Sequence, residues 1–275
     1  MIRTDLALEL REMFAEEIMG VESRAHDSDG ITITHVKITS DEGAEKIGKP
    51  IGNYVTVEIA NTIFEDDDTF DRGVKAVGGE LKKLISPMDL SSVLVVGLGN
   101  RFITPDSIGP KTVSKVTVTR HITKEGGAGY DFGIRPVSAI APGVLGITGI
   151  ETGEIVQGVK EKAKPSLIIA IDALAARNID RLGNTVQLSD TGICPGSGVG
   201  NNRKELTEKT MQIPVIAIGV PMVVDVVTLA TDIVGGRTSI PENIKNMIVT
   251  PNDVDNISEK ISDIIAEGIN MALLS

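Results

Sequence analysis

Five short runs of almost purely apolar residues, all beyond Ser91, constrain the fold of this 275-residue chain more than any other feature. A strand that is apolar on both faces must be covered on both faces, as in a parallel sheet packed between helices. Helix-like stretches separate the runs, as the crossover connections of a parallel sheet require. The runs are SVLVVGLG (92–99), PVSAIAPG (136–143), PSLIIAID (165–172), IPVIAIGV (213–220) and NMIVTP (246–251).

The first part of the chain has a different pattern. Ile31–Ile38 and Tyr54–Ala60 alternate apolar and polar residues, which is typical of half-buried strands. Helical spacing of apolar residues predicts helices over Leu6–Met19 and Asp66–Leu84, and a last helix over Asp253–Leu274. Since no linker or repeat separates the two patterns, we expect one α/β domain. Its mostly parallel sheet would be covered by helices on both faces and carry an N-terminal antiparallel elaboration.

Composition excludes several classes of protein. A formal net charge of −11 argues against direct binding of nucleic acid, because neutralising phosphates requires clustered Lys and Arg. The single cysteine excludes an internal disulfide. The N-terminus lacks the basic-then-apolar layout of a signal peptide, and no apolar run approaches the roughly 20 residues of a membrane span. We therefore expect a protein of the cell interior that has no membrane partner.

Glycine-rich stretches do not predict a nucleotide cofactor. Gly97 and Gly99 follow an apolar run like half of a dinucleotide fingerprint, but Phe102 stands where the third glycine should be. The glycines of loop 196–204 do not match the phosphate-binding pattern G-x-x-x-x-G-K-[ST] either. Tight turns with positive φ are the simpler use of these glycines. We expect no cofactor.

Two aspartates follow apolar runs. Asp172 directly ends PSLIIAID, and Asp106 stands between the run 92–99 and a predicted helix. In open parallel sheets the active crevice lies at the carboxyl ends of the strands, so both side chains should meet there. Either could instead cap a helix or bind a metal. Two carboxylates in one crevice can differ in protonation, so that one activates water and the other donates a proton to a peptide amide. We predict Asp106 and Asp172 to be the catalytic pair.

The stretch SDTGICPGSGVGNN (189–202) contains the Asp-Thr-Gly triplet of pepsin-like proteases. Those enzymes place the triplet in all-β lobes, whereas this part of the chain is predicted to be α/β. The aspartate more simply closes a strand-ending turn. We expect the loop to wall the same crevice, whose predicted lining residues are Asn100, Asp190, Cys194, Gly196, Gly198 and Arg203.

The single cysteine, Cys194, suggests two further chemistries. As a nucleophile it would need a histidine partner, and of His26, His35 and His121 only His121 lies in the relevant half of the sequence. His35 lies inside an alternating strand, where a surface or pairing role is simpler. Together with the two aspartates named above, Cys194 could instead hold zinc with one open position. We expect Cys194 to be a small half-buried side chain without a catalytic role, and we expect no bound metal.

Long segments of the chain resemble the germination protease family of spore-forming bacteria, which is similar in its central fold to the endopeptidases that mature nickel hydrogenases. The resemblance extends from IRTDLALE near the start to GINMALL near the end. It shares with the maturation enzymes a GxGN strand end followed by an acidic residue, here Gly97 to Asn100 and then Asp106. The segments that carry the resemblance are VVGLGNRFITPDSIGPKTV, RPVSAIAPGVLGITGIET, IIAIDALAARNIDRL, SDTGICPGSGVGNNRKE and NMIVTPNDVD.

The resemblance implies an atypical aspartic-type endopeptidase, with catalytic carboxylates at Asp106 and Asp172. It implies a homotetramer that degrades small acid-soluble spore proteins in the spore core during germination. Members of the family are made as inactive precursors and trim their own N-terminus after an acidic residue that precedes an apolar residue and Ala. Here Asp5-Leu6-Ala7 fits that pattern, so residues 1–5 would be the removed segment and 6–275 the protease domain. Asp5 could also cap the first helix.

Two departures from the family pattern stand out. The chain is short between Asp232 and Asn246, and Cys194 stands where a relative has His. Two alternatives stay open: a metal-dependent maturation endopeptidase that acts on another protein, and a binding module without catalysis. Candidate partners for an acidic residue of the substrate are Arg177, Arg203 and Lys204.

Overall fold

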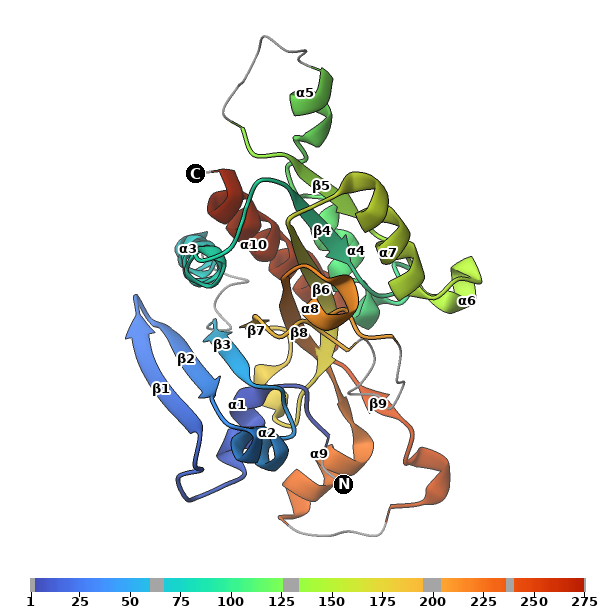
Figure 1. The fold of residues 1–275 in the computed structure, drawn as a ribbon. Coiled ribbons are helices and arrows are strands. Elements are labelled where there is room, and N and C mark those ends of the chain that lie inside the picture. Colours follow the sequence, from blue (N-terminus) through green and yellow to red (C-terminus); the bar gives the residue numbers. More distant parts are fainter. Residues whose placement is uncertain (1–2, 60–66, 126–133, 195–203, 236–239, 275) are drawn as a thin grey trace.

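The structure, a computed structural model, describes residues 3–59, 67–125, 134–194, 204–235 and 240–274. In this part of the chain the strands form one sheet in the order β1-β2-β3-β7-β8-β6-β4-β5, and β9 pairs with β8 beside that path (Figure 1). The strands are β1 (Val21–Ser28), β2 (Ile31–Ile38), β3 (Gly52–Glu58), β4 (Val93–Gly97), β5 (Val137–Ile140), β6 (Leu167–Ala175), β7 (Thr185–Ser189), β8 (Val215–Asp225) and β9 (Ile248–Val249).

The sheet has a parallel half and an antiparallel half. Strands β5, β4, β6 and β8 run parallel to one another, and β4, β6 and β8 are buried except at Ala173. Strands β1, β2, β3 and β7 are antiparallel, and β7 joins β3 to β8. The predicted α/β fold with mostly parallel central strands and an N-terminal antiparallel part is confirmed. The antiparallel half also includes β7, which comes much later in the sequence.

Helices cover both faces of the sheet because its strands alternate apolar side chains between two cores. Val93 and Ile169 belong to the core beneath one set of helices, whereas Leu94 and Ile168 belong to the core beneath the other set. The first set is α3 (Asp67–Ile85), α4 (Ile108–Val113) and α10 (Val254–Leu274), and the second is α7 (Thr152–Ala163) and α8 (Glu208–Met211).

Two further helices, α1 (Ala7–Glu12) and α2 (Asp41–Ile47), pack over the antiparallel half. No helix in the described ranges combines the length and apolarity that crossing a bilayer needs. The remaining helical elements are α5 (Arg120–Glu125), α6 (Leu145–Thr148), α9 (Val226–Val234) and the 3₁₀ turns η2 (Thr104–Asp106), η4 (Ile179–Arg181) and η6 (Glu242–Ile244).

The predicted N-terminal helix is shorter than expected. The pattern predicted Leu6–Met19, but α1 ends at Glu12, with Met13 as its C-cap residue. The Arg11 guanidinium donates a hydrogen bond to the carbonyl of Phe14 at 2.8 Å and so closes a turn. The chain leaves the helix there because Ile18 packs into the core on the outer face of β2. Tertiary packing overrides the helical pattern.

The last predicted strand also differs. The run 246–251 was expected to be a buried strand of the parallel sheet, but β9 spans only Ile248–Val249, is exposed and pairs antiparallel with the end of β8. That end of β8, at Val224 and Asp225, extends beyond the parallel core, so only a short edge contact is possible there. The helices predicted at Asp66–Leu84 and Asp253–Leu274 are confirmed as α3 and α10, each within one residue.

Candidate active site

The carboxylate of Asp106 closes the turn that follows β4. The backbone N–H of Asn100 donates to Asp106 Oδ2 at 2.9 Å. Gly99 has φ +103°, and a Cβ there would lie 2.1 Å from the carbonyl oxygen of Asp106. Only glycine therefore allows this close approach. Asp106 is the half-buried last residue of η2, and the N-cap residue of α4 is Ser107, so Asp106 does not take the predicted cap position.

Asp172 lies on β6, one residue past the point where β4 ends. Its carboxylate Oδ1 accepts a hydrogen bond from the N–H of Ala173 at 3.0 Å. We expected Asp172 to be exposed at the end of its strand, but β6 continues to Ala175 and Asp172 is 5% exposed. The reason is that β8 goes on pairing with β6 past this point, with Gly219 opposite Asp172.

Two glycines bring the elements that carry these aspartates together. A Cβ on Gly97 would lie 2.2 Å from the carbonyl oxygen of Gly109, and a Cβ on Gly109 would lie 2.6 Å from that of Ile171. The first turn of α4 therefore sits directly on the ends of β4 and β6, and η2 contacts both β6 and β8. The structure thus places Asp106 and Asp172 on touching elements at the carboxyl end of the parallel strands, and we call them the aspartate pair.

The other predicted crevice residues take different positions. Asp190 is bound to the start of β3, because its carboxylate accepts from the backbone N–H of Asn53 at 2.8 Å and from the side-chain amide of Asn53 at 2.6 Å. Asn100 accepts from the N–H of Phe102 at 3.0 Å, which stabilises its own turn. Gly196, Gly198 and Arg203 lie outside the described residues.

Of the candidate partners for an acidic substrate residue, Arg177 forms an ion pair with Asp232 at 3.0 Å. The stem of Lys204 lies over Gly153 at the start of α7, where a Cβ would meet it at 3.1 Å. Neither cation lines the pocket that lies between β6, β7 and the loop before β3.

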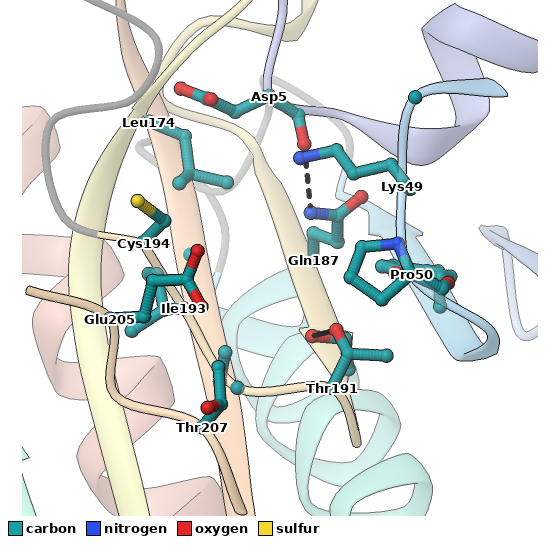
Figure 2. A pocket seen from close by; sticks show the side chains of 16 residues that line it. Asp5, Lys49, Pro50, Leu174, Gln187, Thr191, Ile193, Cys194, Glu205 and Thr207 are labelled. Atoms are coloured by element: carbon teal, nitrogen blue, oxygen red, sulfur yellow. Dashed lines mark hydrogen bonds between the residues drawn. The ribbon is translucent and has the colours of Figure 1, made fainter. Parts of the chain in front are cut away.

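A pocket of about 270 Å³ lies beside the sheet between β6, β7 and the loop before β3 (Figure 2). Leu174 of β6 lines the pocket. It comes two residues after Asp172, so both side chains lie on the same face of the strand. Figure 2 shows Asp5 and Lys49 on one side of the pocket and Cys194 and Glu205 on the other, with the Asp5 carboxylate pointing away from Lys49. Sequence reasoning missed Lys49, which no motif marks.

The N-terminal segment fills one side of this pocket. Asp5 forms two hydrogen bonds with Ala175 at the end of β6: its N–H donates to the Ala175 carbonyl, and its Oδ2 accepts from the Ala175 N–H, each at 2.9 Å. Asp5, Leu6 and Ala7 are all buried. Leu6 packs against Leu174. The peptide bond between Asp5 and Leu6 is therefore inside the protein.

Gln187 of β7 holds the backbone on both sides of Leu6. Its Nε2 donates to the carbonyl of Asp5 at 3.2 Å, and its Oε1 accepts from the N–H of Ala7 at 2.7 Å. Gln187 is itself buried, as is every residue of its strand TVQLS. We call Asp5–Ala7, Gln187 and Ala175 the N-terminal clamp.

Burial and nearby charges shift the pKa values of Lys49 and Cys194, which both line the pocket. Burial lowers the pKa of the Lys49 ammonium, while the nearby Asp5 carboxylate and Cys194 act in the opposite direction. Burial raises the pKa of the Cys194 thiol, and the Glu205 and Asp5 carboxylates raise it further, against the effect of Lys49. Cys194 is therefore a thiol near neutral pH, whereas a nucleophilic cysteine needs a lowered pKa.

The predicted zinc trio of Asp106, Asp172 and Cys194 gains no support. Within the described ranges, the His, Cys and carboxylate side chains that do converge are those of a different group, on β1, β2 and α3. Cys194 lines the clamp pocket, and neither aspartate does so.

Helix α1 is anchored next to the clamp. The buried carboxylate of Glu9 accepts from the backbone N–H groups of Arg177 at 2.7 Å and Asn178 at 2.9 Å. The Arg181 guanidinium lies 3.5 Å from it and also pairs with Glu12. The Thr4 hydroxyl also donates a hydrogen bond to the Glu9 carboxylate, so one contact of the anchor comes from residues 1–5 and the others come from residues beyond Asp5.

The aspartate pair and the clamp lie at different points on β6. Asp172 and Ala175 are three residues apart, which is about 10 Å along an extended strand. The buried bond between Asp5 and Leu6 is therefore held away from the carboxylates.

Comparison with known proteins gives a consistent family. The family model described as germination protease matches residues 3–235. The germination protease of Caldanaerobacter subterraneus subsp. tengcongensis is 44% identical over 304 residues, covering 99% of this chain and 94% of that protein. That of Clostridium acetobutylicum is 44% identical over 310 residues, with 99% and 95% covered. That of Bacillus subtilis is 50% identical over 245 residues, with 85% and 66% covered.

The alignment with the Caldanaerobacter protein is longer than the 275 residues of this chain, so that relative carries additional residues. The predicted shortening between Asp232 and Asn246 stays a prediction. Among solved structures, the [NiFe] hydrogenase maturation protease HycI from Thermococcus kodakarensis KOD1 aligns with 70% of this chain and 99% of its own. Its sequence identity is 18% and its TM-score 0.39, too low to support an argument.

Proposed function

The chain belongs to the germination protease family and is a protease, and from that premise we propose a self-processing endopeptidase that cuts small acid-soluble spore proteins after acidic residues. The observation that carries the proposal is the aspartate pair, which lies on touching elements at the carboxyl end of the parallel strands. Membership of the family further supports action in the spore core at germination, and assembly as a homotetramer.

In the proposed mechanism, one carboxylate of the pair takes a proton from water while the other donates a proton to the leaving amide. Two carboxylates in one site share a proton readily, since their like charges oppose double ionisation. Backbone N–H groups of Asn100 and Ala173 fix one oxygen of each carboxylate. Water can therefore be activated without a metal ion or a cysteine nucleophile.

We propose that residues 1–5 are a removable segment and residues 6–275 the protease domain. The sequence Asp5-Leu6-Ala7 places an acidic residue before the bond to be cut. Because that bond is buried in the clamp and about 10 Å along β6 from Asp172, trimming must begin with release of the segment from Ala175 and Gln187. The uncut chain is then a stable precursor.

We propose that the pocket lined by Lys49 and Leu174 binds the acidic residue of a substrate. Asp5 is itself such a residue, and its carboxylate is bound by the N–H of Ala175 and lies in the field of Lys49. Lys49 suits this role better than Arg177, whose guanidinium is already paired with Asp232. Removing residues 1–5 would free the Ala175 N–H and Lys49 for a substrate aspartate or glutamate.

The test is the mass of the N-terminal product. The wild-type chain, incubated under mildly acidic and dehydrating conditions, should yield a product that starts at Leu6, and Asp172→Asn should yield none while its circular dichroism stays that of a folded protein. Asp180→Asn is the matched control, because Asp180 is an exposed aspartate on the adjacent η4. Trimming by Asp172→Asn at the wild-type rate would reject the aspartate mechanism.

A further inference from the structure

Three potential metal ligands converge toward the β1 edge of the sheet, where the antiparallel half meets α3. His26 lies on the edge strand β1, His35 on β2 and Glu80 on α3. The register pairs His26 with Ile33, two residues from His35, so the two imidazoles share one face of the ribbon. Their rings stack with centroids 5.6 Å apart.

The ligand atoms already have spacings close to those of a coordinated ion. One nitrogen from each histidine and one oxygen of Glu80 all lie within 4.8 Å of one another. His35 Nε2 and Glu80 Oε2 are 3.4 Å apart, which is long for a hydrogen bond between these groups. Tetrahedral zinc with ligands at about 2.0–2.1 Å places its ligand atoms roughly 3.3 Å apart. One edge of such a tetrahedron is therefore present, and His26 needs only a small movement.

The Glu80 carboxylate is positioned to bind a metal ion through one of its oxygens. It is 2% exposed, and a buried carboxylate requires compensation by charge or hydrogen bonds. Lys83 Nζ contacts one oxygen, Oε1, at 2.6 Å, and the other oxygen, Oε2, faces His35. A metal bound through Oε2 leaves the Lys83 contact intact, and such hydrogen bonds commonly orient ligating carboxylates.

Space for an ion and its water is available beside these side chains. His26 and Glu80 line a cavity of about 140 Å³, which also borders Arg72, Lys75 and Gly79. The cations raise the alternative of a bound anion. However, Arg72 already donates to the carbonyl of Asp29 and to Thr69, and Lys75 is exposed, whereas the Glu80 carboxylate would repel an anion.

We propose that His26, His35 and Glu80 form a binding site for a divalent transition metal ion of the zinc type, with a fourth position open to water. Two imidazoles and one carboxylate are a ligand set that such ions favour. The ion would tie β1 and β2 to α3 and so stabilise the exposed edge of the sheet. It serves no step of the proposed proteolysis.

Titration of the full chain with Co²⁺ and Zn²⁺ tests the site. Co²⁺ should give a visible absorption spectrum of tetrahedral type that Zn²⁺ displaces in a 1:1 ratio. His26→Ala should weaken binding roughly 100-fold or more, since it removes one of three ligands. Because His26 is exposed on an edge strand, that variant should fold normally. The control, His121→Ala, removes the exposed histidine of α5 and should bind like the wild type.

Glu80→Gln provides a second variant, which keeps the shape of the buried side chain and removes its charge. It too should lose binding. Hydrogen exchange adds a readout that chance binding to surface histidines would not give: Zn²⁺ should slow amide exchange in β1 of the wild type and not of His26→Ala. Equal Co²⁺ affinity in wild type and His26→Ala would overturn the proposal, as would stabilisation by inorganic phosphate without any response to Zn²⁺.

Discussion

The aspartate pair and the N-terminal clamp share strand β6 but are built in opposite ways. The pair depends on local turns: each carboxylate binds a backbone N–H close to it in sequence, at Asn100 and at Ala173. The clamp joins the first residues of the chain to β6 and β7, with hydrogen bonds that span 170 residues or more. The proposed catalytic carboxylates and the bond to be cut are thus held by independent sets of contacts. A folded chain can therefore carry both without reacting.

The largest expected effect is at the pair. Asp106→Asn should lower the rates of self-trimming and of substrate cleavage about 1000-fold, because the loss of one acid–base group removes proton transfer. Asparagine can still accept the hydrogen bond from Asn100, so the urea midpoint of unfolding should stay close to the wild-type value. If both rates stayed within tenfold of the wild type, Asp106 would serve only to close its turn. The aspartate pair would then no longer be a catalytic region distinct from the clamp.

The anchor of α1 should matter for stability and not for chemistry. Glu9→Ala removes a buried carboxylate that accepts from two half-buried backbone N–H groups and pairs with Arg181, so the free energy of unfolding should fall by about 3 kcal/mol. Glu12→Ala, the control, removes a more exposed partner of Arg181 and should cost less than about 1 kcal/mol. Urea unfolding measures both values. A loss below 1 kcal/mol for Glu9→Ala would show that α1 does not depend on this anchor.

The clamp can be loosened at Gln187. Gln187→Ala removes two hydrogen bonds that hold the backbone around Leu6, each worth about 1 kcal/mol, so self-trimming should become roughly 30-fold faster. The rate of appearance of the Leu6 product checks this, with Gln157→Ala on α7 as the control. Slower trimming would mean that Gln187 acts on the scissile carbonyl during catalysis, and the two regions would then be one site.

The smallest expected effect reports on the pocket after trimming. The Asp5 carboxylate helps to raise the pKa of Cys194, so removal of residues 1–5 should lower that pKa and increase the thiolate fraction. Alkylation of Cys194 by iodoacetamide at pH 8 should therefore be several-fold faster in the trimmed protein than in the uncut Asp172→Asn variant. Mass spectrometry over time measures both rates. Equal rates would show that Asp5 does not act on Cys194.

The aspartate pair could be predicted from sequence because its signals are local. Asp106 and Asp172 each follow an apolar run, and the topology of a parallel sheet brings such strand ends together. Even so, the burial of Asp172 was not predictable, since it depends on how far β8 continues to pair with β6.

The clamp could not be predicted, because its parts carry no shared local pattern. Lys49 is one of many lysines, and Gln187 is one of three polar residues in its strand TVQLS. Their meeting depends on β7 pairing antiparallel with β3, across more than 120 residues of sequence. A different contact, the packing of Ile18 against β2, ended the N-terminal helix at Glu12.

The separation of 170 residues between Asp5 and Ala175 also has a consequence for biosynthesis. The N-terminal segment leaves the ribosome well before β6, yet its docking site does not exist until β6 and β7 have both been made and have paired with β8, which lies between them in the sheet. Long-range contacts of this kind form late in folding. If Asp172 cuts the segment, the catalytic site and the clamp that holds the bond away from it are both completed only when β8 (Val215–Asp225) has joined β6 to β7. An unfinished chain can then neither trim itself nor attack its neighbours.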